Sequence, residues 1–199
     1  DYYASRGLGD VYKRQALCGK FEEKFLSLPK EAIITPMREH QRYFPVVDEE
    51  GRLLNKFITV RNGGKEFLDV VAHGNERVLR ARLSDAEFFF NEDRKLKLED
   101  RLEKLKTVSF QEGLGNMYDK SERLAKLAEM VKFAINVKVD DTNLKRTALL
   151  SKTDLVAGMV VEFTELQGVM GREYAKLDGE PAEVAEGIYA VSYTHLTLP

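Results

Sequence analysis

The sequence LLSKTDLVAGMVVEFTELQGVMGREYA, from Leu149 to Ala175, is the longest nearly all-apolar helical pattern in the chain. A helix that is apolar on all sides is normally buried at the centre of its domain. We therefore expect the segment from Asn143 to Phe163 to form a central helix against which other helices pack.

Two charged residues, Lys152 and Asp154, interrupt this apolar pattern. On one continuous helix, two positions correspond to a rotation of about 200°, so these charges cannot neutralise each other. An unpaired buried charge is costly, and we expect each residue to find a partner in another segment. The alternative is that one or both charged heads reach the surface. The predicted partners are Asp119 or Glu122 for Lys152, and Lys120 or Arg123 for Asp154.

The overall composition excludes several classes of protein. The chain has 199 residues, 43% hydrophobic and 32% charged, which fits one large domain or two small ones. With 31 basic and 33 acidic residues the net charge is −2, so contact with nucleic acid must come from a local patch. The single cysteine, Cys18, excludes a disulfide framework and fits a reducing compartment. No apolar run approaches the roughly 20 residues that cross a bilayer, so we expect a cytoplasmic protein without a membrane partner.

Both ends of the chain differ from the rest. Residues 1–15 and 191–199 lack amphipathic continuity with their neighbours, and they resemble translated sequencing-adapter read-through. We interpret both as non-native tails and leave them out of the predicted fold. The chain is then expected to be a piece of a longer protein.

Residues 16–68 are predicted to form a small α/β unit. Apolar residues recur every three or four positions from Ala16 to Leu28, which predicts an amphipathic helix ended by Pro29. The β-branched segment Ala32–Thr35 is a candidate for a short strand.

A β-hairpin is predicted in the second half of this unit. Tyr43–Val47 and Leu53–Val60 read as two strands separated by a turn-rich segment. Pro45 has no amide hydrogen to donate to a neighbouring strand, so its strand is expected at the edge of the sheet. Asn62–Gly64 is predicted to be the loop that closes the unit.

From Phe67 to Ala190, apolar residues recur at the spacing of α-helices. They predict a helical connector over residues 69–109 and a helical domain over residues 110–190, with a glycine-containing bend at Phe110–Gly115. Thr164 and Gln167 have the spacing of a capping box. The predicted fold class is therefore α+β, with a small β-containing N-terminal unit before a mainly α-helical domain. The other expected helices are Asn75–Asn91, Leu98–Val108, one with the apolar face Leu124, Leu127, Ala128, Val131, Ala134 and Ile135, and one that begins near Pro181.

Two basic clusters could bind phosphate, because arginine forks match phosphate oxygens. At 100° per residue, Arg77 and Arg80 share a helix face that Arg82 does not. The alternative is a solvated surface whose arginines pair with nearby acids such as Glu76. Tyr43 and Phe44 could stack on a base, although aromatic residues of a strand more often belong to the core. The candidate RNA-binding residues are Arg38, His40, Arg42, Arg77, Arg80 and Arg82.

Other chemistry is poorly supported by the residues. The histidines are His40, His73 and His195, and the helical domain from Asp100 to Ala190 has none, so we expect no zinc site. The glycines at Gly113–Gly115 do not form a phosphate-binding loop, and no Gly-x-Ser-x-Gly elbow is present. We therefore expect no autonomous active site and no bound metal.

Four long strings, in order and in register, carry a family resemblance. They resemble the beta subunit of the bacterial α2β2 glycyl-tRNA synthetase, over about residues 16–190. They are TPMREHQRYFPV (Thr35–Val46), NERVLRARLSDAEFFFNEDRK (Asn75–Lys95), FQEGLGNMYDKSERL (Phe110–Leu124) and LSKTDLVAGMVVEFTELQGVMGREYA (Leu150–Ala175).

The resemblance implies a division of labour between two subunits. The alpha subunit would bind ATP, Mg²⁺ and glycine and carry the catalytic core, whereas the beta subunit would contribute to binding tRNA(Gly). The partners implied for this chain are therefore the alpha subunit and tRNA(Gly).

The resemblance also implies that residues 110–190 form an HD-like helical domain, similar to metal-dependent phosphohydrolases. The positions matching that family's metal ligands read Asp119, Lys120, Lys152 and Asp154, and the ligand histidines are absent. We expect a degenerate site in which these residues have structural roles. The rival hypothesis is a working HD-type phosphohydrolase, and a third is that the isolated piece binds nothing.

Overall fold

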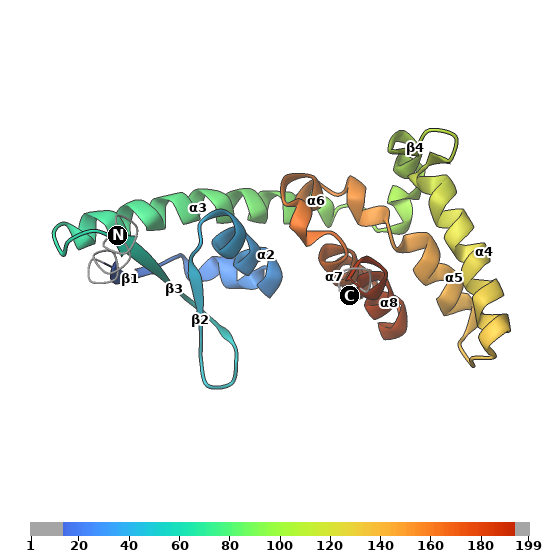
Figure 1. Ribbon diagram of the computed structural model, residues 1–199, viewed down its shortest axis with the longest axis horizontal. Coiled ribbons are helices and arrows are strands. Elements are labelled where there is room, and N and C mark those ends of the chain that lie inside the picture. The colour runs from blue at the N-terminus through green and yellow to red at the C-terminus, as the bar shows by residue number, and fades with distance from the viewer. Residues whose placement is uncertain (1–13, 194–199) are drawn as a thin grey trace, which may run out of the picture. The chain divides into compact units, whose positions relative to one another are not determined.

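The computed structural model describes residues 14–193. The chain divides into two compact units, and the division falls after Phe88, within the long helix α3 (Leu68–Asp93). Strands lie mainly in the first unit and helices make up the second, which confirms the α+β class (Figure 1). Within the described residues, no helix combines the length and apolar character needed to cross a bilayer.

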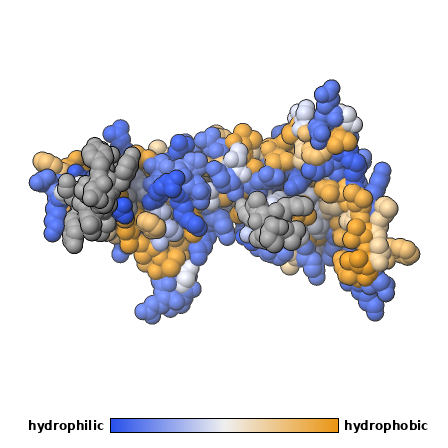
Figure 2. All heavy atoms as spheres, in the orientation of Figure 1, coloured by the Kyte–Doolittle hydropathy of each residue, from blue (hydrophilic) through white to orange (hydrophobic). Residues whose placement is uncertain are grey.

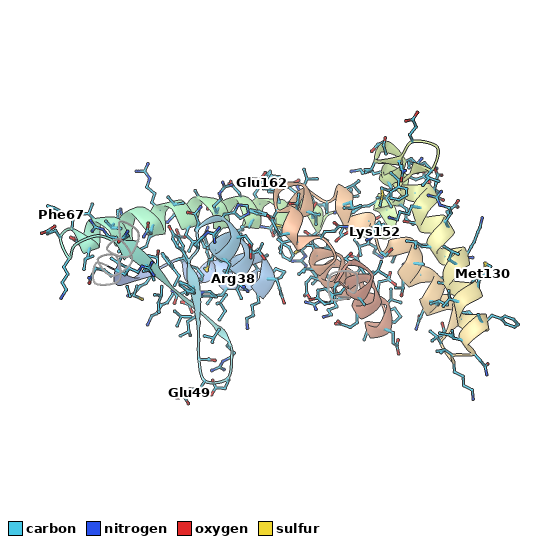
Figure 3. The ribbon with its side chains drawn as sticks, in the orientation of Figure 1. Arg38, Glu49, Phe67, Met130, Lys152 and Glu162 are labelled. Carbon is cyan, nitrogen blue, oxygen red and sulfur yellow. The ribbon has the colours of Figure 1, made fainter. Side chains whose placement is uncertain are left out.

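The N-terminal unit contains a three-stranded antiparallel sheet with the order β1-β3-β2. Its strands are β1 (Arg14–Lys20), β2 (Phe44–Val47) and β3 (Leu53–Asn62). The predicted hairpin of β2 and β3 is confirmed, and its turn lies at Glu49 (Figure 3). Pro45 lies in the edge strand β2, as expected for a residue without an amide hydrogen.

The helix predicted over Ala16–Leu28 is wrong. The segment forms β1 followed by the 3₁₀ helix η1 (Glu23–Ser27). Leu17 and Phe21 are both buried, and their spacing of four residues is compatible with a strand as well as with a helix. Gly19 lies between them on the same face, where a Cβ would collide with the ring of Phe57. The close approach of Phe57 therefore favours the strand.

The strand predicted over Ala32–Thr35 is also wrong. This segment belongs to helix α2 (Lys30–Thr35), which continues into the π-helical turn η2 (Pro36–His40). Ala32, Ile33 and Met37 are buried at helical spacing. Burial of this face overrides the strand preference of the β-branched residues.

The C-terminal unit begins with the end of α3, followed by η3 (Glu99–Thr107) and a two-stranded hairpin of β4 (Ser109–Gln111) and β5 (Gly115–Asn116). The segment predicted as an amphipathic helix from Leu98 to Val108 is thus 3₁₀. The hairpin lies at the predicted glycine-containing bend, where no strands were predicted. The remaining elements are α4 (Met117–Ile135), α5 (Asp141–Leu150), η4 (Thr153–Val156), α6 (Gly158–Glu162), η5 (Thr164–Leu166), α7 (Val169–Asp178) and α8 (Ala182–Tyr193).

Three helix pairs organise this unit. Helix α4 packs on α5, α5 on α8, and α7 on α8. The start of α4 is fixed by a capping box in which Asn116 and Asp119 each accept the other's backbone amide, at 3.0 Å and 2.9 Å. Helix α8 begins directly after Pro181, as predicted. The fully buried core of the unit includes Leu150, Met159, Phe163, Leu166, Met170, Val184 and Ile188.

The central helix predicted over Asn143–Phe163 is broken into α5, η4 and α6. Ser151 Oγ and Thr153 Oγ1 donate to the carbonyls of Ala148 and Leu150, at 2.9 Å and 2.7 Å. Such local hydrogen bonds compete with the helical pattern and mark its end. The predicted capping box at Thr164 is absent, and α7 begins instead after Gly168, whose φ of 79° is typical of glycine.

Candidate nucleic-acid interface

Three of the predicted RNA-binding residues lie next to one another in the N-terminal unit. Arg38 and His40 belong to the turn η2, and Arg42 precedes β2. Arg42 has a φ of 55°, which is uncommon for a residue other than glycine. The Tyr43 amide closes this turn by donating to the Met37 carbonyl at 2.8 Å. The left-handed turn brings Arg38 of η2 beside the edge strand.

The two aromatic residues that follow have opposite environments. Tyr43 is buried and stacks on Phe57, with 4.8 Å between ring centroids, so it belongs to the core. Phe44 is 58% exposed. Because successive residues of a strand point to opposite faces, Phe44 is directed away from the core that holds Tyr43. Phe44 is therefore available to stack on a ligand.

Two open depressions meet at Arg42 and Phe44. The first has a volume of about 460 Å³ and is also lined by Arg38, Tyr43 and Pro45. The second, of about 400 Å³, is also lined by Arg14, Val60 and Asn62. We call the surface formed by Arg14, Arg38, Arg42 and Phe44 the arginine groove.

Among the described residues, none that lines the arginine groove is acidic. Within residues 14–193, no carboxylate lies within ion-pair distance of Arg14, Arg38 or Arg42. Three guanidinium groups without a carboxylate partner in this part of the chain can donate paired hydrogen bonds to phosphate oxygens. The sequence prediction omitted Arg14, because it had been assigned to a tail, yet Arg14 pairs with Asn62 in the β1–β3 ladder.

The arginines of α3 have a different environment. Arg80 Nε lies 3.0 Å from Glu22 Oε1, in an ion pair of two half-exposed side chains. Glu76 accepts the Lys20 amide at 2.9 Å, and Glu87 pairs with Lys24 at 3.1 Å. These contacts tie α3 to the segment that follows β1. No described contact joins Arg77, Arg80 or Arg82 to the arginine groove.

The four residues of the predicted degenerate metal site make different contacts. Asp119 caps α4, and Lys120 Nζ lies 4.0 Å from the centroid of the Phe110 ring. Among the described residues, no group of three or more His, Cys, Asp or Glu side chains could hold a metal ion.

The ionic partners predicted for Lys152 and Asp154 are wrong. Asp154 Oδ2 accepts the amides of Gly168 and Gly171, at 2.5 Å and 3.2 Å. Lys152 Nζ lies 3.4 Å from Ser192 Oγ. Hydrogen bonds from backbone amides can stabilise a buried carboxylate in place of a cation. The sequence carries no signal for such amide contacts.

Asp154 is fully buried, and its Oδ1 has no hydrogen-bond partner among the described residues. Burial raises the pKa of Asp154 to about 6, against the opposing effects of the Gly168 and Gly171 amides and of Lys152. Burial likewise lowers the pKa of Lys152, and the charge of Asp154 opposes this. The two side chains therefore influence each other, which the prediction of one continuous helix had excluded.

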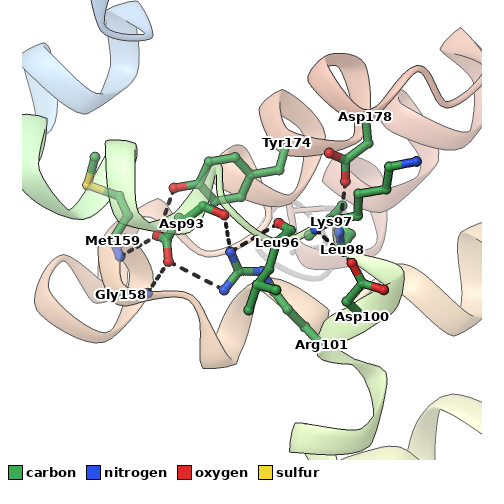
Figure 4. A network of polar contacts seen from close by, with 10 residues as sticks. All are labelled: Asp93, Leu96, Lys97, Leu98, Asp100, Arg101, Gly158, Met159, Tyr174 and Asp178. Carbon is green, nitrogen blue, oxygen red and sulfur yellow. Dashed lines mark hydrogen bonds and ion pairs between the residues drawn. The ribbon is translucent and has the colours of Figure 1, made fainter.

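A second buried polar network links the end of α3 to α6 and α7 (Figure 4). Asp93 Oδ1 accepts the Gly158 amide at 2.8 Å, and Oδ2 accepts the Met159 amide at 2.9 Å and the Tyr174 hydroxyl at 2.8 Å. Arg101 Nη1 lies 3.4 Å from Asp93 Oδ1, and Arg101 Nη2 donates to the carbonyls of Asp93 and Leu96. Burial and the Asp93 carboxylate raise the pKa of Tyr174, so its hydroxyl stays a donor.

Comparison with known protein families shows which family the chain belongs to. A family model described as "Glycyl-tRNA synthetase beta subunit" matches residues 12–195. The chain belongs to this family. The resemblance seen in the four sequence strings is thereby confirmed.

Curated glycine–tRNA ligase beta subunits are close relatives of the chain. Identity is 53% over 175 residues to the protein of Desulforamulus reducens, 58% over 175 residues to that of Syntrophotalea carbinolica, and 51% over 176 residues to that of Bacillus subtilis. Each alignment covers 87% of this chain but only 25% to 26% of the relative. The chain therefore spans about a quarter of the length of these glycyl-tRNA synthetase beta subunits.

The raised pKa of Asp154 predicts a measurable pH dependence of stability in this beta-subunit chain. The folded state favours the protonated carboxyl, because its pKa rises from 3.8 to about 6. The unfolded chain binds fewer protons in that window, so the free energy of unfolding should fall by about 2 kcal/mol between pH 4 and pH 6. Asp154→Asn retains an oxygen acceptor but does not titrate, so it should lack this component. Urea unfolding of both proteins across the window tests this, and parallel pH profiles would contradict it.

Proposed function

We propose that the chain is part of the beta subunit of a cytoplasmic glycine–tRNA ligase and supports tRNA binding. The reaction is the ATP-dependent attachment of glycine to tRNA(Gly). In this proposal the separate alpha subunit binds ATP, Mg²⁺ and glycine and performs the chemistry. The partners of the chain are then the alpha subunit and tRNA(Gly).

The observation that carries the proposal is the arginine groove on a chain of this family. Its arginines offer planar forks for phosphate groups, and the exposed ring of Phe44 offers a face for an unstacked base. A net charge of −2 gives no diffuse attraction to RNA, so a concentrated basic surface is the form that such binding would take.

The arginines of α3 are a second candidate RNA surface. Arg77, Arg80 and Arg82 all lie on this one helix. The remaining candidate, His40, lies in η2 between Arg38 and Arg42 of the arginine groove. We rank α3 below the groove because the guanidinium of Arg80 already has a carboxylate partner in Glu22. Surface ion pairs contribute only about 0 to 1 kcal/mol, so an RNA phosphate could still compete for Arg80.

For residues 110–190 we propose an HD-like helical domain with a structural role. Asp119, Lys120, Lys152 and Asp154 occupy the matching positions, and their contacts are a helix cap, a ring contact, a half-buried hydrogen bond and hydrogen bonds to buried backbone amides. No observation in the described residues favours the rival phosphohydrolase. In the proposed enzyme, glycine activation belongs to the alpha subunit alone.

The experiment uses the complete alpha and beta subunits and separates two reactions. Arg42→Gln should lower kcat/KM for tRNA in glycine charging by roughly tenfold or more, the effect of losing one charge-assisted hydrogen bond. Glycine-dependent ATP–pyrophosphate exchange without tRNA should stay unchanged. Arg80→Gln, made in parallel, should change charging much less. Unchanged charging by Arg42→Gln, or equal losses in both reactions, would overturn the proposal.

A further inference from the structure

Helix α4 carries an apolar stripe that nothing in the described chain covers. Leu127, Met130, Val131 and Ile135 are between 53% and 67% exposed. At 100° per residue these four side chains lie within an arc of about 140° on one side of the helix. Figure 2 shows hydrophobic residues gathered at the surface in the region of α4 and α5, and Met130 is marked at the outer side of α4 in Figure 3.

The packing of α4 inside its own unit uses another side of the helix. Met117, Ser121 and Ala125 are the buried residues of α4, which packs against α5 and η3. Ser121 and Ala125 point about 120° and 160° away from Leu127 around the helix axis, and Met117, in the first turn, points about 80° away. The stripe is therefore additional to the helix contacts that already hold α4 in place.

The composition of the stripe is that of a buried surface. Its residues are aliphatic or methionine. Phe133 adds an exposed apolar side chain near the end of the same helix, and the exposed Val137 and Val139 follow the end of the helix. Single exposed apolar residues are normal, but a continuous row of this kind marks a surface that another segment covers. The sequence analysis also placed Leu127, Val131 and Ile135 on one apolar face of the helix.

We propose that this stripe is covered, in the complete beta subunit, by an apolar segment of the same polypeptide that lies outside the 199 residues. Relatives are about four times as long as the stretch matched here, so most of the subunit is available as the partner. The proposal rests on family membership and is independent of the RNA role of the arginine groove.

The size of the stripe favours a covalently linked partner over a separate chain. A stable complex of two chains buries about 800 Å² on each partner, far more than four half-exposed aliphatic side chains present. A segment of the same polypeptide escapes this requirement, because linkage converts docking into an intramolecular event with a high effective concentration. Neither a second copy nor the alpha subunit has that advantage.

The test measures cysteine accessibility at the stripe. Val131→Cys is placed in the 199-residue chain and in the complete beta subunit, and N-ethylmaleimide labelling of the peptide containing position 131 is followed by mass spectrometry. We expect fast labelling in the 199-residue chain and at least tenfold slower labelling in the complete beta subunit without the alpha subunit. Met130→Cys gives an independent second reading.

Lys126→Cys, an exposed position on the same helix outside the stripe, is the matched control and should label at similar rates in both proteins. Equal rates at position 131 in both proteins would overturn the proposal, as would equal slowing at positions 126 and 131. Protection that appears only after the alpha subunit is added would assign the stripe to that subunit. If labelling of the 199-residue chain slows as its concentration rises, the stripe is covered by a second copy. If labelling of that chain is slow at every concentration, the stripe is covered by the chain itself. Each of these three results contradicts the proposal.

Discussion

Replacing Asp93 by alanine should cost the C-terminal unit about 3 to 5 kcal/mol of folding free energy, because the change leaves a buried charge without its partner. Arg101 is only 3% exposed, and its ion-pair contact is with the Asp93 carboxylate. The same carboxylate accepts the Tyr174 hydroxyl and the amides of Gly158 and Met159. Alanine would leave the buried Met159 amide and Tyr174 hydroxyl, and the half-buried Gly158 amide, without this acceptor.

The matched control is Asp100→Ala. Asp100 is exposed and accepts the Lys97 amide at 3.2 Å, so its loss should cost less than about 1 kcal/mol. Thermal unfolding separates the two, since 1 kcal/mol corresponds to a shift of about 2 to 4 °C in Tm for a chain of this size. Similar melting temperatures for Asp93→Ala and Asp100→Ala would show that the buried network does not hold the unit together.

Replacing both Arg38 and Arg42 by glutamine should weaken tRNA(Gly) binding by the complete enzyme by about 2 to 6 kcal/mol. Each arginine is expected to contribute about 1 to 3 kcal/mol through charge-assisted hydrogen bonds to phosphate. Both side chains line the same depression, so their losses should not be fully additive, and the lower half of this range is expected.

Arg52→Gln supplies the matched control for this double variant. Arg52 is an exposed arginine of the same unit, but it pairs with Asp48 at 2.7 Å and with Glu50 at 2.6 Å near the β2–β3 turn. Its neighbouring acids make it a poor phosphate ligand, so the variant should bind tRNA nearly as the parent does. A filter-binding or fluorescence titration at fixed salt measures all three proteins. Equal losses for Arg52→Gln and the double variant would refute a role specific to the arginine groove.

The parts of the fold that were predictable depend on local signals. Pro45 and the turn between Val47 and Leu53 mark an edge strand and a hairpin within a few residues, and both were correctly predicted. The strand at Leu17–Phe21 was not predicted, because apolar residues four positions apart fit a helix as well as a strand. The close approach of Phe57 to Gly19 distinguishes the strand from a helix, and Phe57 lies far from Gly19 in the sequence.

The polar interior could not be predicted for a similar reason. The carboxylate of Asp154 is held by amides 14 and 17 residues further on, which have no signature in the sequence. Asp93 and Arg101 lie in a strongly charged stretch that is typical of a solvated surface. Their burial depends on the packing of α6 and α7, which tertiary structure alone determines.

The candidate interface was predictable in part. Arg38 and Arg42 were selected because arginine suits phosphate, and the structure places them at one depression. Arg14 was missed because its segment was set aside as a tail. The exposure of Phe44 beside a buried Tyr43 depends on which face of the sheet is covered, and the sequence alone did not determine that.

The salt dependence of tRNA(Gly) binding by the complete enzyme tests the central claim most directly. Each phosphate contact releases counterions, so the slope of log K against log salt concentration counts the contacts. The Arg38→Gln/Arg42→Gln variant should have a slope smaller than that of the parent by roughly one to two units, one for each lost contact. A slope identical to that of the parent, with or without weaker binding, would mean that the arginine groove does not contact the tRNA backbone.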